Sequence, residues 1–165
     1  MKKDVIIIGG GLAGLTAAYL LEKKNIYPTI LEARDRLGGR IHTIRPDKNK
    51  RVEMGATWLG KQHQSLIHMI RELGLDMEEQ YLGDKAFYEY ISTSPPQLVQ
   101  LPPNEDPTWR IKGGSDCLIE ALQGKLTDTK IFTGQVVKKI KKGEKVEVQT
   151  ASKSYFADVV INTLP

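Results

Sequence analysis

The first thirty residues alternate between apolar runs and polar breaks in the pattern of a strand, a helix and a second strand. Residues 5–8 form an uninterrupted β-branched run, which is typical of a central parallel strand that is buried on both faces. Residues 12–24 have helical periodicity, and residues 28–31 are predicted to be the next strand. The inner face of this helix is predicted to consist of Ala13, Ala17 and Leu21. Together these elements predict a βαβ unit and a parallel sheet.

The rest of the chain predicts two further helices and otherwise mainly β structure. One helix is expected at residues 62–73, where apolar residues recur at helical spacing and Gly74 is placed to end it. A second helix begins near Ser115, a residue type that favours the N-cap position. The charged stretch 45–51 contains Pro46 and is expected to be a loop. Strands are expected at residues 41–44, 87–91, 130–132, 136–141, 145–150 and 155–163.

Prolines interrupt the pattern in the middle of the chain. Five of the eight prolines fall between residues 94 and 107. Because proline fixes φ and removes a backbone donor, we expect residues 92–108 to form a connector or edge segment within one domain that spans residues 1–165. The last residues, 162–165, follow an apolar run directly, and the final proline predicts a loop that leads onward. We therefore expect an N-terminal portion of a longer protein.

Composition narrows the classes of function. The formal net charge of +4 is too small to imply a nucleic-acid partner. The single cysteine, Cys117, excludes an internal disulfide and fits a reducing compartment, and the three histidines lack metal-ligand spacing. The uncharged run after Lys2 and Lys3 resembles a secretory signal superficially, but its four glycines fit a turn and a helix better. We therefore expect a cytoplasmic protein without a metal site or a membrane span.

The clearest chemical motif is a G-x-G-x-x-G sequence formed by Gly9, Gly11 and Gly14, directly between the first strand and the first helix. In a dinucleotide-binding fold the first glycine allows the tight turn, the second lets a pyrophosphate approach the backbone, and the third lets helix and strand pack closely. The helix then presents free N–H groups to the phosphates from its first residues, Leu12 and Ala13. A chance glycine turn is the alternative, but the strand–turn–helix context favours a dinucleotide site.

An acidic residue stands where a ribose-binding group is expected. Glu32 follows the second predicted strand, eighteen residues after Gly14, close to the usual spacing of about 20 residues. Its carboxylate can accept hydrogen bonds from both hydroxyls of an adenosine ribose. A 2′-phosphate would be repelled by that charge, so NADP is disfavoured.

A second glycine motif follows within residues 32–43, Glu-Ala-Arg-Asp-Arg-Leu-Gly-Gly-Arg-Ile-His-Thr. By itself, a glycine pair flanked by arginines could be a solvated loop. After a dinucleotide fingerprint, however, this run resembles the extended signature of the flavin-containing amine oxidase family, which includes the monoamine and polyamine oxidases. The resemblance implies FAD, with backbone running along the pyrophosphate and an arginine that neutralises phosphate charge. The residues so implied are Ala33, Arg34, Gly38, Gly39 and Arg40.

The resemblance extends along the chain. Residues 52–60 are similar to the family segment that passes close to the flavin, which implies cofactor contacts from Gly55, Ala56, Thr57 and Trp58. Relatives usually have two glycines where this chain has Gly55-Ala56. Residues 109–115 resemble the segment before the helix that returns to the FAD domain, although an ordinary glycine turn explains them equally well. Residues 136–140 resemble the strand whose valine, here Val137, contacts adenine through its backbone, and a plain hairpin strand is the alternative.

By resemblance, the expected fold is α/β: a Rossmann-like FAD-binding domain with a parallel sheet, flanking helices and a β-rich excursion. The intact enzyme would oxidise a small-molecule amine by moving a hydride from substrate carbon to flavin N5. The family's long helical insertion corresponds to the interval between Tyr90 and Trp109, and its later half would supply a lysine near N5 and an aromatic cage. This chain matches only the FAD-binding share, so no catalytic residue is assigned. An uncovered apolar surface is expected to favour self-association.

Two other classes of function remain open. The same cofactor domain serves carotenoid-type desaturases, protoporphyrinogen oxidase and flavin-dependent sugar mutases, and the fold does not decide among them. A truncated, non-catalytic remnant that binds FAD weakly is the second alternative.

Overall fold

The computed structural model describes residues 3–47, 50–81, 83–103 and 105–164. The chain divides into two compact units, one made of Met1–Thr57 with Gly113–Pro165 and the other of Trp58–Lys112. The helices are α1 (Leu12–Glu22), α2 (Gln64–Glu72) and α3 (Asp116–Lys125). The strands are β1 (Val5–Ile8), β2 (Thr29–Leu31), β3 (Thr43–Asp47), β4 (Lys50–Glu53), β5 (Met77–Glu79), β6 (Lys85–Tyr88), β7 (Gln97–Gln100), β8 (Trp109–Ile111), β9 (Lys130–Phe132), β10 (Val137–Lys141), β11 (Val146–Thr150), β12 (Ser154–Ala157) and β13 (Val159–Asn162).

The first unit is built on the predicted parallel sheet. Its strand order is β13-β1-β2-β9, and every neighbouring pair is parallel. The β1–α1–β2 segment is the predicted βαβ unit, with Ile7 of β1 paired with Ile30 of β2. All four residues of β1 are buried, as its continuous β-branched sequence predicts for a central strand. The Rossmann-like α/β fold expected from the sequence is therefore confirmed.

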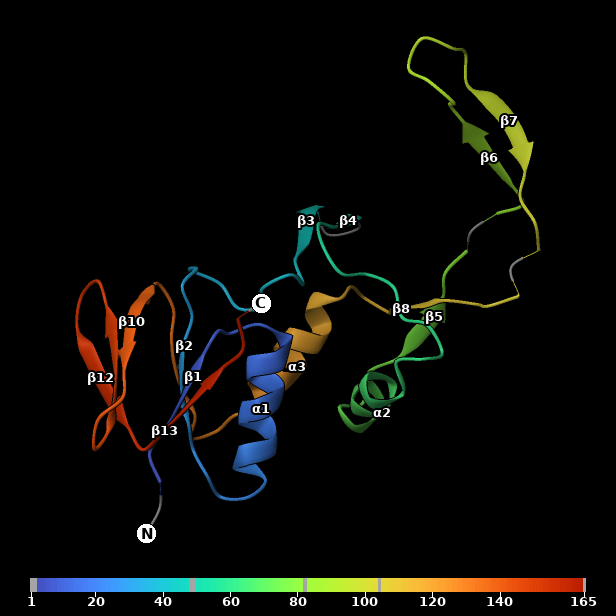
Figure 1. Ribbon diagram of the computed structural model, residues 1–165. Helices are drawn as coiled ribbons and strands as arrows, with labels where there is room; N and C mark the ends of the chain where they lie inside the picture. Colours follow the sequence, from blue (N-terminus) through green and yellow to red (C-terminus); the bar gives the residue numbers. More distant parts are fainter. Residues whose placement is uncertain (1–2, 48–49, 82, 104, 165) are drawn as a thin grey trace. The chain divides into compact units, whose positions relative to one another are not determined.

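The two faces of this sheet are covered by different layers. Figure 1 shows α1 and α3 on one side and the antiparallel sheet β10-β11-β12 on the other. Ile6 and Ile8 of β1 form a core with Val148 of β11 and Ala157 of β12. Because side chains alternate along a strand, Ile7 points to the opposite, helical layer. The β-rich excursion is thus a third layer of the core.

The buried face of α1 differs from the prediction. Gly14, Leu15 and Ala18 are the buried residues of the helix, whereas Ala13 is exposed. The predicted face of Ala13, Ala17 and Leu21 is wrong at Ala13, whereas Ala17 and Leu21 are half-buried at the edge of the buried face, because the apolar residues of this helix do not form a narrow stripe. The close approach of Gly14 to β1 decides which side of the helix turns inward.

In the second unit, α2 ends as its sequence predicts. Gly74 has a φ of +73°, which glycine adopts without strain. Its N–H donates to the carbonyl of Arg71, while the N–H of Leu75 donates to that of Ile70. This pair of bonds is a Schellman motif, which satisfies the last carbonyls of the helix. Two antiparallel strand pairs, β5–β8 and β6–β7, make up the other elements of this unit, and β7 is an edge strand inside the proline-rich stretch.

The predictions for two β segments need correction. Of residues 45–51, which were expected to be a loop, 45–47 belong to β3 and 50–51 to β4, and these strands are antiparallel partners in which Ile44 pairs with Val52. Residues 48–49 lie outside the described residues. Pro46 falls where the pairing is irregular, so its missing N–H removes no regular ladder bond. The predicted strand 155–163 is two strands, because the N–H groups of Asp158 and Val159 both donate to Asp4 and the chain changes sheets there.

Ser115 does not cap α3 with its side chain, contrary to the prediction. Glu53 instead accepts the Ser115 N–H at 3.0 Å, and the Thr43 hydroxyl oxygen accepts the Asp116 N–H at 3.2 Å. The β3–β4 hairpin thus supplies the acceptors that the start of the helix needs. The guanidinium of Arg45 pairs with the Asp116 carboxylate in the same network.

Candidate functional site

The first glycine turn is packed too tightly to accept side chains at two of its motif positions. A Cβ on Gly14 would lie 2.0 Å from the carbonyl oxygen of Gly9, far inside van der Waals contact. Gly9 has a φ of +104°, and a Cβ there would lie 2.7 Å from the hydroxyl oxygen of Thr163. These contacts match the roles predicted for the first and third glycines of the motif. Thr163, which the motif did not indicate, also donates its hydroxyl to the carbonyl of Ile8 at 2.8 Å.

Gly11 differs from its neighbours because the chain itself leaves room beside it. A Cβ on Gly11 would have no contact closer than 3.8 Å, which is ordinary van der Waals distance. Protein packing therefore does not require glycine here. The first N–H in the helix to donate within it is that of Leu15, so those of Leu12, Ala13 and Gly14 precede the helical bonding pattern. Neither an acidic residue nor a side-chain cap occupies the first turn of α1.

Glu32 lies against this turn with its side chain buried. The residue is 5% exposed, and its carboxylate accepts the N–H of Gly10 at 2.6 Å and that of Arg34 at 2.9 Å. Each oxygen thus accepts one backbone donor, and a carboxylate has acceptor capacity for more. Gly10, a variable position of the motif, is also restricted, since a Cβ there would lie 2.6 Å from the Leu37 side chain. The only sequence signal for that restriction was that Gly10 is the middle one of three consecutive glycines.

The second glycine motif is paired directly with the first. Gly11 and Gly38 form a parallel bridge, and the N–H of Gly38 donates to the carbonyl of Gly10 at 2.9 Å. A Cβ on Gly39 would lie 3.2 Å from the Cα of Gly11. Two segments that are separated by α1 and β2 therefore meet backbone to backbone, as expected if both border one ligand.

Three arginines of this region differ in their surroundings. Arg34 and Arg40 are exposed, and the adjacent Ala33 is exposed as well. Arg36 is half-buried and donates to three carbonyl oxygens of the loop that follows it. Sequence reasoning assigned no role to Arg36, because its charge alone does not distinguish it from its neighbours.

The third predicted segment runs beside the second. The N–H of Ala56 donates to the carbonyl of Arg40 at 3.1 Å, and a Cβ on Gly55 would lie 1.8 Å from that same oxygen. Thr57 closes a local turn by donating its hydroxyl to Gly55 at 3.1 Å. Trp58 begins the second unit, in which its side chain is 61% exposed. The structure thus brings Gly55, Ala56 and Thr57 to the glycine segments.

The segment before β10 lies beside Glu32 and Arg34. The N–H of Gln135 donates to the carbonyl of Glu32, and that of Gly134 donates to the carbonyl of Arg34, both at 2.8 Å. Val137, two residues further, is half-buried against the apolar core below. The valine predicted to lie near adenine is therefore close in the chain to residues that contact Glu32 and its neighbour.

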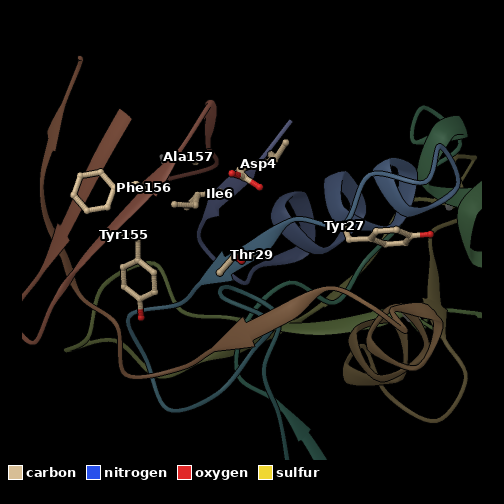
Figure 2. A pocket seen from close by; sticks show the side chains of 8 residues that line it. Asp4, Ile6, Tyr27, Thr29, Tyr155, Phe156 and Ala157 are labelled. Carbon is tan, nitrogen blue, oxygen red and sulfur yellow. The ribbon is translucent and has the colours of Figure 1, made fainter. Parts of the chain in front are cut away.

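A separate hollow lies at the opposite end of the parallel sheet. It has a volume of about 160 Å³ and is lined by residues at the amino ends of β1 and β2, such as Ile6 and Thr29, and by Tyr155 and Phe156 of β12 (Figure 2). The glycine turn follows the carboxyl end of β1, so the hollow is distinct from the glycine segments. Ligands of open α/β sheets bind at the carboxyl ends of the strands, which favours the glycine segments as the site.

The described residues show neither a metal-ligand cluster nor a membrane-spanning helix. The described residues contain no group of three or more histidine, cysteine, aspartate or glutamate side chains that could hold a metal ion. No helix among residues 3–47, 50–81, 83–103 and 105–164 is long and apolar enough to cross a membrane.

The fold and the paired glycine segments define a Rossmann-like α/β protein. The family model of the flavin containing amine oxidoreductases matches residues 12–94 and 80–165, and the chain belongs to this family. Membership implies a flavin cofactor, as the resemblance predicted.

Curated relatives agree with this placement, and solved structures share the fold. Human flavin-containing amine oxidase B is 34% identical over 106 residues, which are 64% of this chain and 20% of that protein. Flavin-containing amine oxidase of Oncorhynchus mykiss is 43% identical over 72 residues, 44% of this chain and 14% of that protein. A structure of wild-type putrescine oxidase bound to putrescine superposes with a TM-score of 0.80 at 19% identity, covering 100% of this chain and 58% of that one. The chain thus spans a fifth or less of these two curated relatives.

Proposed function

We propose that this chain is the FAD-binding part of a flavin-dependent amine oxidase. The observation that supports this most strongly is the backbone pairing of Gly11 with Gly38, with the buried carboxylate of Glu32 beside it. Two glycine segments and a carboxylate at the carboxyl end of adjacent parallel strands fit an adenine dinucleotide. We further propose that residues 1–165 together form this part of the enzyme.

The residues present fit the adenosine diphosphate half of FAD at its pyrophosphate, its ribose and its adenine. The room beside Gly11 suits a pyrophosphate, which the N–H groups of Leu12, Ala13 and Gly14 would bind. Glu32 would accept hydrogen bonds from the ribose hydroxyls, and its charge would exclude a 2′-phosphate. Arg34 and Arg40, both exposed, would neutralise phosphate charge. The backbone of Val137 would contact adenine.

The remaining segments would serve the flavin half. The glycine pair Gly38-Gly39, with Ala33 before it, would lie along the pyrophosphate and ribityl chain, while Gly55, Ala56, Thr57 and Trp58 would border the flavin. FAD, when bound, would accept a hydride from the carbon next to the substrate nitrogen. The contribution of this chain is to hold the cofactor and orient it, and amine recognition is proposed for the remainder of the enzyme.

The test is a titration of the purified chain with FAD, ADP and NAD. The wild type is expected to bind FAD and ADP, whereas Gly11→Val should bind neither, because the new side chain would occupy the pyrophosphate path. Gly124→Ala, in α3, is a matched control, since a Cβ there would meet nothing within 4 Å. Unchanged FAD affinity in Gly11→Val would overturn the proposal.

The other enzyme classes on this cofactor domain make a different prediction for the whole protein. A desaturase, protoporphyrinogen oxidase or sugar mutase would not release peroxide with amines, whereas an amine oxidase would. The downstream coding sequence decides between an intact enzyme and a non-catalytic remnant.

We also propose that an exposed apolar surface of the second unit favours self-association. Phe87 of β6 and Leu98 of β7 are cross-strand partners, and they are 77% and 58% exposed. Contiguous exposed apolar surface is typical of protein–protein interaction sites. Sedimentation velocity would test it: Phe87→Ser should shift the chain toward monomer, and an unchanged distribution would refute it.

We also propose a cytoplasmic location, because a single cysteine fits a reducing compartment. Imaging of the tagged whole protein tests this proposal.

A further inference from the structure

The guanidinium of Arg36 holds the loop that contains the second glycine pair. Its Nη1 donates to the carbonyls of Leu37 at 3.1 Å and Ile41 at 3.3 Å, and its Nη2 donates to that of Gly39 at 3.1 Å. Three carbonyl oxygens of one short loop therefore converge on one cation. A planar group with five N–H donors can satisfy them together, which a lysine ammonium cannot do with the same geometry.

These bonds also set the direction of the opposite ends of the peptides. In a trans peptide the C=O and N–H groups point in opposite directions. The Leu37 carbonyl points to Arg36, and the N–H of the same peptide, that of Gly38, donates to Gly10 in the first glycine turn. The Gly39 carbonyl also points to Arg36, so the N–H of Arg40 points away from the guanidinium. The Leu37–Gly38 peptide is held at both ends, by Arg36 and by Gly10. The Gly39–Arg40 peptide is held at its carbonyl by Arg36, and without that bond the Gly39 carbonyl could turn toward a phosphate.

The neighbouring arginines have a different environment. Among the described residues, the guanidinium groups of Arg34 and Arg40 have no hydrogen-bond or ion-pair partner, and both residues are exposed. Arg36 is half-buried and its donors are engaged by the loop itself. The three cations are therefore not equivalent: two can turn toward an anion, and one is committed to backbone.

We propose that Arg36 is a positioning residue, which orients the Gly39–Arg40 peptide so that the N–H of Arg40 and not the carbonyl of Gly39 faces the cofactor pyrophosphate. The inference rests on the proposed function. Arg36 acts through the loop, so its guanidinium geometry matters more than its charge. Arg40, by contrast, would act through its charge.

The test compares Arg36→Lys and Arg36→Gln with Arg40→Gln in titrations with FAD, ADP and AMP. We expect both Arg36 variants to bind FAD and ADP roughly tenfold or more weakly, because bonds from a charged donor are lost. AMP, which lacks the pyrophosphate, should bind as in the wild type. The deficit of the Arg36 variants should persist at about 0.5 M salt, while that of Arg40→Gln should shrink, because salt screens exposed charges. Arg71→Gln, on the exposed side of α2, controls for loss of an arginine.

Two results would overturn the assignment: an Arg36→Lys variant that binds FAD like the wild type, or equal losses for AMP and FAD, which would indicate a general loss of structure. If a variant does not fold, NMR of the wild type tests the proposal instead. In ¹⁵N NMR, the Arg36 guanidinium protons should exchange slowly without FAD and shift little on its addition, whereas those of Arg40 should shift. Fast exchange at Arg36, or a larger shift there than at Arg40, would refute the proposal. A wild type that binds neither FAD nor ADP would instead refute the proposed function. In that case the exchange rate of the Arg36 guanidinium protons without FAD would still test whether Arg36 holds the loop.

Discussion

The carboxylate of Glu32 accepts a hydrogen bond of 2.6 Å from the N–H of Gly10, so the end of β2 is joined to the turn after β1 by a buried side chain. Its second oxygen accepts the N–H of Arg34 at 2.9 Å. Glu32 therefore has a structural task that is present before any ligand binds. Experiments on this residue must separate that task from ribose binding.

For Glu32→Gln we expect ADP and FAD affinities at least roughly tenfold lower, because a hydrogen bond to a charged acceptor is typically worth about 1.5–3 kcal/mol. The amide keeps the shape of the side chain and can still accept one backbone N–H. The discriminating ligand is 2′,3′-dideoxy-ADP, which has no ribose hydroxyls. The substitution should weaken ADP more than the dideoxy analogue, and equal losses for both would contradict ribose binding by Glu32.

For Gly14→Ala we expect a loss of stability of about 1–3 kcal/mol, the usual cost of overpacking. The new methyl group would meet the Gly9 carbonyl at 2.0 Å, so helix α1 must move away from β1. Urea unfolding followed by circular dichroism measures the change. Gly124→Ala has open space around its Cβ and should stabilise α3 by about 0.5–1 kcal/mol, because alanine is the better helix former. Equal stabilities of the two variants would show that the turn is looser than described.

Glu22, the last residue of α1, should make stability depend on pH. Its carboxylate accepts the N–H groups of Thr127, Asp128 and Thr129 before β9. Burial alone would raise the pKa of Glu22, but these hydrogen bonds outweigh it and lower the pKa below the ordinary value of 4.5. A lowered folded-state pKa gives stability that is present above the unfolded-state pKa and is lost as the pH falls through the folded-state value.

The wild type should therefore lose stability as the pH falls below about 4.5, and Glu22→Gln should flatten that dependence. At neutral pH the substitution should cost on the order of 1 kcal/mol, because the loop is largely exposed and water can replace part of the bonding. The measurement is the urea midpoint of wild type and variant, determined at intervals of about one pH unit between pH 3 and 7. Glu120→Gln removes an exposed carboxylate of α3 and controls for net charge. Parallel curves for wild type and Glu22→Gln would count against this assignment.

The isolated chain, saturated with FAD, should not oxidise amines at the rate of an intact relative. Hydride transfer requires the substrate carbon to be held against the flavin in a cavity that excludes water. This chain covers 58% of the putrescine oxidase chain and 20% of human amine oxidase B. Peroxide release with a panel of mono- and polyamines is the measurement. Turnover at ordinary kcat values, on the order of 1–10³ per second, would show that the chain already contains a substrate site.

Several features of this protein could be predicted from local sequence because their causes are local. The β-branched run at residues 5–8, the glycine motif and Gly74 each act through the conformation or packing of a few adjacent residues. The spacing from Gly14 to Glu32 also identified the carboxylate that the structure places beside the turn. Backbone preference and hydrophobic periodicity are sufficient for such elements.

Tertiary contacts decided the rest, and each case involves residues far apart in the chain. The start of α3 receives its acceptors from Glu53 and Thr43 and not from Ser115, because the hairpin 43–53 folds against it. The strand expected at 155–163 divides where its N–H groups meet Asp4. A side chain at Gly10 would displace the Leu37 side chain, which packs beside it. A sequence reports propensities along the chain, but hydrogen-bond partners and steric neighbours across it exist only once the segments have met.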